Sequence, residues 1–353
     1  MKSIEIKGYK SIKRLTIDLR PINILIGANG SGKSNFVSFF DFLYNLYELK
    51  LNTYIAKRGG VDKFLHHGRK QTEELYFYLD FDINGYAATI VPTTDGRFFF
   101  KEENLYFKGN PWGINPFNNE AQLKYSDLPR ASYIRNYITQ CRKYHFHDTG
   151  VSTPFAKSSH IDNDQHYLYA DGHNLAAYLY NIQKEYPTTY RSIVSVVKSV
   201  APYFSDFFLH PNSEGYINLQ WTDKYSDTTY GVEELSDGTL RFIALTVLFL
   251  QPNLPNTIII DEPELGLHPF AIAKLAGLIQ SAAQRKCQVI AATQSAELIS
   301  YFEPKDIIAV DQQKGESFFK RLSAEELSVW LDNDYTLGEL WVKSIIAAAQ
   351  PNY

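Results

Sequence analysis

Residues 27–34 have the residue types and spacing that hold a phosphate group. They spell G-A-N-G-S-G-K-S, which matches G-x-x-x-x-G-K-[ST] at every fixed position. The glycines permit a tight loop whose backbone N–H groups point at phosphate oxygens. We expect Lys33 to bind the β- and γ-phosphates of ATP and the Ser34 hydroxyl to ligate Mg²⁺. The loop alone does not distinguish a kinase, a transporter ATPase or a motor.

An acidic pair, Asp261 and Glu262, follows the apolar run at 257–260. A buried parallel strand would present both carboxylates at its carboxyl end, where open α/β sheets bind their ligands. We expect Asp261 to hold Mg²⁺ and Glu262 to act as the general base for the attacking water. The phosphate loop and the acidic pair together predict ATP hydrolysis.

A third segment, E-E-L-S-D-G-T-L-R at 233–241, leads into an apolar helix expected at 242–250. Ser236 suits a helix N-cap, and Gly238 leaves the first turn open. A helix start of this kind can receive a phosphate. The chain therefore carries two half-sites for one nucleotide, which predicts that two copies of it sandwich each ATP.

The elements that position these residues are visible as hydrophobic patterns. The apolar run at 22–26 is typical of a buried parallel strand, and apolar residues at helical spacing follow the loop from Phe36 to Leu43. The other expected elements are antiparallel strands at 72–83 and 86–92, helices on either side of Pro187 within 174–200, a strand at 306–310 and a helix from Ala324. The pattern predicts an α/β fold.

The composition is that of an ordinary globular protein. The 353 residues are 21% charged and 44% hydrophobic, and the net charge of -4 gives no global signal for nucleic-acid binding. Cys141 and Cys287 lie far apart without a metal-type spacing, which fits a reducing cytosol. Neither a signal peptide nor a transmembrane run is evident. We expect a cytoplasmic protein with no membrane partner.

The histidines include one pair that could share a face. His145 and His147 are two residues apart, so both would lie on one side of the strand expected there. No further ligands at suitable spacing support a zinc site. As an alternative, His147 or Asp148 approaches the nucleotide or its Mg²⁺.

The order of these motifs resembles the ATP-binding-cassette type of ATPase. The residues on which this resemblance rests are the phosphate loop, L-S-D-G-T at 235–239 and I-I-I-D-E-P-E at 258–264. The chain is most similar to the cytosolic group that contains SMC, RecF and the OLD ATPases, often described as AAA-family ATPases in bacteria. Stretches such as R-G-G-V-D-K-F-L-H-H-G at 58–68 and P-E-L-G-L-H-P at 263–269 resemble a compact branch of that group.

The resemblance implies a two-lobed ATPase head with a central, mostly parallel sheet and an antiparallel sheet. Residues 1–150 would carry the phosphate loop, 151–215 a short helical insertion, and 216–353 the signature, the acidic strand and the switch loops. The insertion stands where SMC proteins place their coiled coil, but no heptads continue from it. About sixty residues follow Gln294, too few for the nuclease domain of OLD nucleases. We expect neither a coiled coil nor a nuclease domain.

The resemblance also assigns roles to single residues. The phosphate contacts would come from Asn29, Gly30, Ser31, Gly32, Lys33, Ser34 and Asn35. Ser236 and Gly238 would contact the γ-phosphate bound by the other copy. His268 ends the loop that crosses the dimer interface, and Arg58 resembles an arginine that SMC-type heads place near the nucleotide. Lys33, Glu262 and Gln294 are the catalytic candidates.

These expectations favour an ATP-gated homodimer that acts as a switch on DNA or on a partner effector, a nuclease or a toxin. Anti-phage defence and DNA maintenance are roles that fit. Two alternatives are the ATPase subunit of a membrane transporter and a monomeric P-loop kinase. The N-terminal I-K-G-Y-K-S-I-K and Gln294 argue against the transporter, and a monomeric kinase leaves Ser236 and Gly238 unexplained.

Gln294 follows the apolar run at 288–292, where ATPases of this type usually place a histidine that senses the γ-phosphate. A glutamine amide forms hydrogen bonds but carries no protonic charge. We therefore predict slow hydrolysis, with ATP serving more as a clamp than as a fuel. The substitution Gln294→His should raise the steady-state rate of phosphate release. Fast turnover in the unchanged protein, with no gain in the variant, would contradict this prediction.

Overall fold

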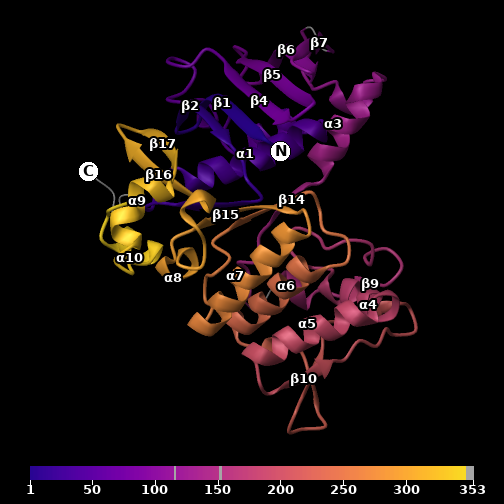
Figure 1. Ribbon diagram of the computed structural model, residues 1–353. Helices are drawn as coiled ribbons and strands as arrows, with labels where there is room; N and C mark the ends of the chain where they lie inside the picture. The colour runs from indigo at the N-terminus through magenta and orange to yellow at the C-terminus, as the bar shows by residue number, and fades with distance from the viewer. Residues whose placement is uncertain (115–116, 151–152, 347–353) are drawn as a thin grey trace.

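Two sheets form the framework of the computed structural model, which describes residues 1–114, 117–150 and 153–346 (Figure 1). The first sheet is antiparallel throughout. Its strands in spatial order are β2 (Ile12–Asp18), β1 (Ser3–Tyr9), β4 (Leu75–Phe81), β5 (Asn84–Pro92), β6 (Phe98–Phe107) and β7 (Asn110–Gly113).

The second, central sheet is mostly parallel and holds the sequence motifs. Its strands in spatial order are β17 (Glu316–Arg321), β16 (Ile307–Gln313), β3 (Ile22–Ile26), β15 (Gln288–Thr293), β14 (Thr257–Asp261) and β8 (Cys141–Tyr144). Neighbouring strands run parallel except β17, which pairs antiparallel with β16. All five residues of β3 are buried, as expected of a strand covered on both faces.

Helix α1 lies on one face of the central sheet and helices α6 and α7 lie on the other (Figure 1). The helices of the described ranges are α1 (Lys33–Tyr47), α2 (Leu51–Lys57), α3 (Pro129–Thr139), α4 (Leu175–Glu185), α5 (Pro187–Val200), α6 (Asp237–Leu250), α7 (Pro269–Gln284), α8 (Ala296–Ile299), α9 (Ala324–Leu331) and α10 (Leu337–Val342). Short 3₁₀ helices are η1 (Val61–Lys63), η2 (Leu123–Tyr125), η3 (Pro154–Ala156), η4 (Val232–Glu234) and η5 (Pro304–Asp306). Two small sheets pair β10 (Phe204–Phe207), β12 (Trp221–Asp223) and β13 (Thr229–Tyr230), and β9 (Ser159–His160) with β11 (Tyr216–Ile217).

The two faces of the central sheet belong to two hydrophobic cores. Alternate strand residues such as Ile258 and Ile260 pack with α4 to α7, whereas Ile259 packs with α1 and the antiparallel sheet. This is the period of two that a strand imposes on its side chains. The result is the two-lobed molecule of Figure 1, in which the indigo and purple sheet lies above and the orange and rose helices lie below.

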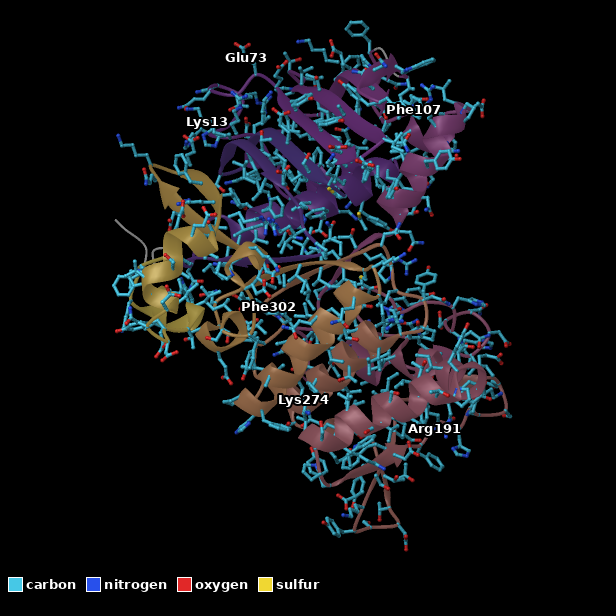
Figure 2. All side chains as sticks on the ribbon, in the orientation of Figure 1. Lys13, Glu73, Phe107, Arg191, Lys274 and Phe302 are labelled. Atoms are coloured by element: carbon cyan, nitrogen blue, oxygen red, sulfur yellow. The ribbon has the colours of Figure 1, made fainter. Side chains whose placement is uncertain are left out.

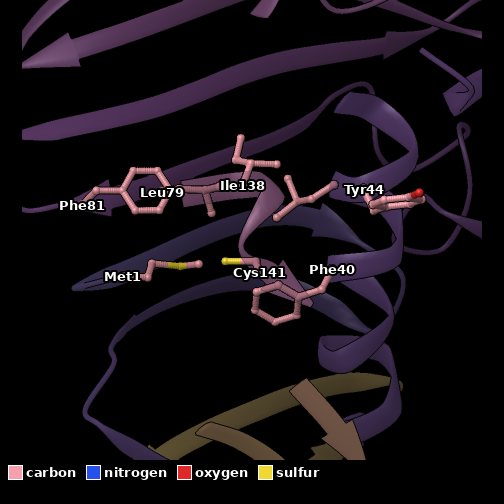
Figure 3. A pocket seen from close by; sticks show the side chains of 8 residues that line it. Met1, Phe40, Tyr44, Leu79, Phe81, Ile138 and Cys141 are labelled. Carbon is pink, nitrogen blue, oxygen red and sulfur yellow. The ribbon is translucent and has the colours of Figure 1, made fainter. Parts of the chain in front are cut away.

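The core between α1 and the antiparallel sheet is closely packed. Figure 3 shows the side chains of Met1, Phe40, Ile138 and Cys141 around a cavity of about 10 Å³, which has room for about one water molecule. Burial raises the pKa of the Cys141 thiol, so this cysteine stays an uncharged core residue. The side chains of Figure 2 fill the space between the layers in the same way elsewhere.

Most predicted elements are present with small shifts in their ends. The strands expected at 72–83, 86–92 and 306–310 are β4, β5 and β16, and Pro187 begins α5. One prediction is wrong: β8 ends at Tyr144, so His145 and His147 lie beyond it and share no strand face. Helices α4 and α5 share a core with α6 and α7, which joins 151–215 to the C-terminal part. No helix in the described ranges is long and apolar enough to cross a bilayer.

Asn23 interrupts the apolar run of β3 and is fully buried. Its Nδ2 donates to the Arg20 carbonyl at 2.6 Å, and its Oδ1 accepts from the Arg20 N–H at 2.9 Å. The same Oδ1 accepts from Arg321 Nη2 at 2.6 Å. One amide therefore ties the start of β3 to β17 at the sheet's far edge.

Replacing Asn23 with Leu should lower the free energy of unfolding by about 2–4 kcal/mol, because the partners of the amide stay buried without a hydrogen bond. Urea denaturation followed by circular dichroism measures this change. The control is Asn333→Leu, since Asn333 is exposed, and its effect should stay within about 0.5 kcal/mol. Equal losses in the two variants would contradict the assignment.

Candidate functional site

The register of the central sheet brings three candidate loops to one edge. Strand β15 lies between β3 and β14, with Thr293 opposite Ile26 and Ala292 opposite Asp261. The carboxyl ends of β3, β15 and β14 are therefore aligned, and the loops that follow these strands begin side by side. The phosphate loop, the acidic pair and Gln294 therefore converge, as expected of a ligand site in an α/β sheet.

The phosphate loop packs so tightly on its surroundings that two positions require glycine. A Cβ at Gly27 would clash with the Val310 carbonyl oxygen, and one at Gly32 would clash with Ser317 Oγ. Both glycines also have positive φ angles, 157° and 113°, which disfavour other residues. The loop is thus held directly against β16 and β17.

Hydroxyl groups from outside the loop fix its position. Ser317 Oγ donates to the Ser31 carbonyl at 2.6 Å and lies 2.8 Å from Ser11 Oγ. Asn35 Nδ2 donates to the same Ser11 Oγ at 2.7 Å. The Asn35 side chain therefore binds Ser11, which leaves its backbone N–H as the group that can contact phosphate.

Lys33 begins α1 with its side chain buried inside the loop. Its Nζ donates to the carbonyl oxygens of Gly27 at 2.6 Å and Ala28 at 3.0 Å. Burial lowers the pKa of Lys33, whereas the carboxylates of the acidic strand and the turn after it raise it. The Lys33 ammonium group thus lies against carbonyl oxygens of the loop and near the carboxylates of the acidic strand.

Three polar atoms that lack partners among the described residues lie in these loops. Ser31 Oγ, Asp261 Oδ1 and Glu264 Oε2 are buried without a hydrogen bond. Burial raises the pKa of Asp261, and a hydrogen bond with the Ser34 hydroxyl lowers it. Buried polar groups usually find partners, so these atoms fit a polar ligand.

Ser34 and Asp261 fit a magnesium ion. The Ser34 hydroxyl lowers the pKa of Asp261, so the two side chains lie close together, and both offer the oxygen ligands that Mg²⁺ prefers. In the described ranges, no group of three or more His, Cys, Asp or Glu side chains could hold a metal. A nucleotide-bound Mg²⁺ needs fewer protein ligands, because phosphate and water oxygens complete its shell.

The candidate general base, Glu262, contacts Gln294 directly. Gln294 Nε2 donates to Glu262 Oε1, and the Glu262 N–H donates to the Ala292 carbonyl at 2.7 Å. Glu262 has a φ of 43°, an uncommon conformation that turns the chain sharply after β14. The sequence thus placed both residues at one site, and their mutual hydrogen bond orients the carboxylate.

Glu264 is a site residue that the sequence patterns did not single out. Its Oε1 accepts from Thr293 Oγ1 at 2.5 Å and from the Gln294 N–H at 3.2 Å. Burial raises the pKa of this carboxyl group. Glu264 fixes the start of the loop that presents Gln294 to Glu262. The one sequence signal for Glu264 was its position as a third acidic residue, two residues after Glu262.

The signature turn lies at the exposed start of α6. Ser236 is the N-cap, and its Oγ accepts from the Thr239 N–H at 3.2 Å. The helix begins at Asp237, five residues earlier than the apolar pattern at 242–250 indicated. A Cβ at Gly238 would clash with the Gly266 carbonyl, so this turn packs on the loop at 263–268.

His268 and Arg58 have local structural partners. His268 is the N-cap of α7, and its Nδ1 accepts from the Phe270 N–H at 3.3 Å. The Arg58 guanidinium stacks on the Tyr54 ring with its carbon 4.9 Å from the ring centroid. Within the described residues, no hydrogen bond or ion pair joins either residue to the phosphate loop, so their nucleotide contacts stay predictions.

Arg241 is a second residue that the patterns missed. Its Nε donates to the Phe146 carbonyl at 2.8 Å, Nη2 to the His147 carbonyl at 3.1 Å, and Nη1 to the Leu265 carbonyl. Burial lowers the pKa of Arg241. One buried cation thus holds the signature helix, the segment after β8 and the loop at 263–268 together.

His147 lies in the electrostatic field of the acidic pair. Burial and the Arg241 cation lower the pKa of His147, and the charges of Asp261 and Glu262 raise it. His147 is therefore linked to the site in two ways: its carbonyl accepts from Arg241, and its ring lies near the charges of Asp261 and Glu262. This arrangement favours the alternative in which His147 approaches the nucleotide.

A cavity of about 630 Å³ is lined in part by Ser11, the residue that accepts a hydrogen bond from Asn35. Its lining includes Lys10 and Ser11 from the turn after β1, and His67, Gly68 and Gly315. Burial lowers the pKa of Lys10 to about 8, with a smaller contribution from the Arg58 charge. The cavity has the size of a small-molecule pocket, and Ser11 connects it to the loop.

Two family models match the chain. One described as "AAA ATPase domain" matches residues 1–173, and one described as "AAA domain, putative AbiEii toxin, Type IV TA system" matches residues 168–300. A search of curated proteins finds no match.

Solved structures with a similar fold are SMC heads. An SMC head bound to the C-winged helix domain of ScpA has a TM-score of 0.62 at 19% identity, over 93% of this chain and 99% of that chain. A Pyrococcus furiosus Smc head bound to the C-terminal domain of ScpA has a TM-score of 0.55 at 16% identity, covering 94% and 98%. A Pyrococcus yayanosii Smc head with a coiled coil and joint has 0.52 at 13%, covering 94% and 99%.

The motifs, the family models and the fold agree. The chain matches models of AAA ATPase domains along residues 1–300 and has the fold of SMC heads, which supports ATP hydrolysis. Its α/β fold, with a mostly parallel sheet beside an antiparallel one, is the ABC-type head that the sequence predicted. The predicted resemblance to SMC-type ATPases is therefore confirmed at the level of the fold.

The contacts of Glu264 predict that its replacement lowers kcat and leaves the affinity for ATP nearly unchanged. Glu264→Leu should lower kcat about 100-fold, because Gln294 and Glu262 lose their alignment, while the affinity for ATP stays within about twofold. Glu264→Gln keeps an oxygen that accepts from Thr293 and Gln294, so it should retain most activity. Steady-state kinetics and fluorescent-nucleotide binding measure both quantities. An unchanged kcat in the Leu variant, or an equal loss in both variants, would contradict this role.

Proposed function

We propose that two copies of this ATPase close around ATP, so that the phosphate loop of one copy faces the signature turn of the other. The observation that carries the proposal is the placement of Ser236 and Gly238. This turn is exposed at its start and packs on the loop at 263–268 of its own chain. In the described ranges, no hydrogen bond joins it to the phosphate loop of the same chain, so a phosphate-binding helix start is free for a second copy.

Exposed apolar side chains next to the signature turn support such an interface. Leu265 is 48% exposed and precedes Gly266, which Gly238 contacts, and Phe270 in the first turn of α7 is 50% exposed. Apolar side chains gathered beside a polar site are typical of surfaces that become buried in a complex. The proposed dimer would bury them together with the nucleotide.

Within each copy, the residues divide the work of hydrolysis. Lys33 and the loop N–H groups bind the phosphates, and the base and ribose enter the cavity beside Ser11. Ser34 and Asp261 would hold Mg²⁺, which supplies charge neutralisation for the transferred phosphoryl group. Glu262 orients the attacking water and accepts its proton. The Gln294 amide holds the Glu262 carboxylate without carrying charge, which supports slow turnover.

The dimer would serve as a switch on a partner in the cytoplasm. Two of the similar SMC heads are bound to domains of ScpA, a separate protein, which supports a protein partner here. The family description that includes a putative toxin of a toxin–antitoxin system supports a toxin or nuclease as the effector. Anti-phage defence is the role we favour, and DNA maintenance with direct DNA contact is the alternative.

The dimer is testable with a variant that binds ATP without splitting it. Glu262→Gln removes the general base, so light scattering after gel filtration should find a dimer with ATP and Mg²⁺ and a monomer without nucleotide. A monomer under both conditions at about 100 times the dissociation constant for ATP would sink the proposal.

A matched control separates the interface from folding. Ser236→Asp in the Glu262→Gln background keeps an N-cap acceptor for α6, so the helix stays stable. It also places a negative charge where the partner's γ-phosphate would bind. The double variant should bind ATP but stay monomeric, whereas Ser236→Thr should still dimerise. Dimerisation of the Ser236→Asp variant at the same ATP concentration would count against the signature contact.

A further inference from the structure

A second large cavity lies on the other side of α1. It measures about 650 Å³ and is enclosed by the outer face of α1, strand β8 and the segment 167–173. Its lining contains no residue of the phosphate loop, the acidic pair or the signature turn. The volume is that of a pocket for a small organic ligand. Nothing in the proposed ATPase cycle uses this cavity.

Tyrosine rings dominate the wall of this cavity. Tyr44 and Tyr47 come from α1, and Tyr167 and Tyr169 come from the facing segment. Tyr44 is 58% exposed and Tyr167 is 46% exposed, so both rings are partly accessible, although Arg142 lies over the Tyr167 ring. Exposed aromatic rings around a cavity provide surfaces on which planar rings such as nucleobases stack.

The facing segment is fixed in place before any ligand binds. Asn174 is fully buried, and its Nδ2 donates to the Tyr167 carbonyl at 2.7 Å. Its Oδ1 accepts from the Tyr169 N–H at 2.9 Å. The His145 N–H, just beyond β8, donates to the Ala170 carbonyl at 2.9 Å. A preorganised wall lowers the entropy cost of binding.

The charges in the cavity leave one cation available. Lys143 pairs with Asp41 at 2.7 Å, and His173 pairs with Asp171 at 2.7 Å. Arg142 makes no ion pair within the described ranges; its guanidinium carbon lies 4.4 Å from the Tyr167 ring centroid. A guanidinium beside an aromatic ring suits a ligand that joins a planar base to a phosphate.

We propose that this cavity binds a nucleotide unit, with its base stacked on the tyrosines and its phosphate on Arg142. The unit is either a free nucleotide or one residue of a single strand, since both present the same base and phosphate. Phosphate contact by Arg142 and stacking on Tyr167 are coupled, because the two side chains already lie against each other. The site is separate from the phosphate loop and does not depend on the proposed dimer.

The position of Arg142 on β8 connects the cavity to the ATPase site. The chain runs from Arg142 and Lys143 to the Phe146 and His147 carbonyls, which bind Arg241 of the signature helix. Asp41, the partner of Lys143, lies on α1, the helix that begins at the phosphate loop. A ligand in the cavity thus contacts two elements that end at the nucleotide site.

Binding is measured on the full chain carrying Lys33→Ala, which disables the phosphate loop. Labelled mononucleotides and a labelled single-stranded oligonucleotide are titrated by fluorescence anisotropy. We expect binding that weakens at least about tenfold on Arg142→Gln and on Tyr167→Ala, while Tyr167→Phe keeps its ring and its affinity. Binding of mononucleotides identifies a free nucleotide as the ligand, and binding of the oligonucleotide alone identifies a single strand.

Two surface substitutions outside the cavity serve as controls. Tyr133 on α3 and Arg191 on α5 are both exposed and do not line the cavity, and Figure 2 labels Arg191. Tyr133→Ala and Arg191→Gln should leave binding unchanged.

Two results would overturn the proposal. They are no binding of either probe to the Lys33→Ala chain up to about 1 mM, and binding that survives both cavity substitutions. Capture of an extended peptide by the same two side chains, without nucleotide binding, would identify a peptide site along β8 instead.

Discussion

The parallel pairing of β15 with β3 on one side and with β14 on the other is the constraint on which the site depends. It sets Thr293 opposite Ile26 and Ala292 opposite Asp261, so three chain segments leave the sheet at one level. A slip of one residue would turn each strand's core side chains to the wrong face. The separate hydrophobic cores on the two faces hold the register, and the register in turn aligns the phosphate loop with the acidic pair and Gln294.

The sequence predicted the parts of the site that are local. The phosphate loop, the acidic pair and the Ser236 cap are each defined by residues within one short segment and by the strand or helix beside it. Three further contacts join residues that lie far apart in the chain, so no local pattern could reveal them. Glu264 and Thr293 are 29 residues apart, Arg241 and Phe146 are 95 apart, and Ser317 and Ser31 are 286 apart.

The errors in the prediction have physical causes of the same kind. The apolar pattern placed the start of the signature helix too late, because its first turn is polar and faces solvent. His145 and His147 follow a short strand that ends where the backbone turns to meet the segment 167–173. The side chain of Asn35 faces Ser11 because the turn after β1 packs on the loop, so the phosphate contact expected of Asn35 stays a prediction for its backbone N–H.

Arg241 joins three segments that are far apart in the chain: the signature helix α6, the segment after β8 and the loop at 263–268. Within the described residues, the hydrogen bonds of the Arg241 side chain end on backbone carbonyls, so this buried cation is paired with the backbone and not with a carboxylate. Two of these carbonyls follow β8, and the third belongs to the loop that continues from Glu262 and Glu264. Any displacement of the signature helix must move both segments or leave a buried charge unpaired, which costs several kcal/mol. Displacing the signature turn would therefore also move the segment after β8 and the loop that follows Glu262, through the Arg241 side chain and the carbonyls that it binds.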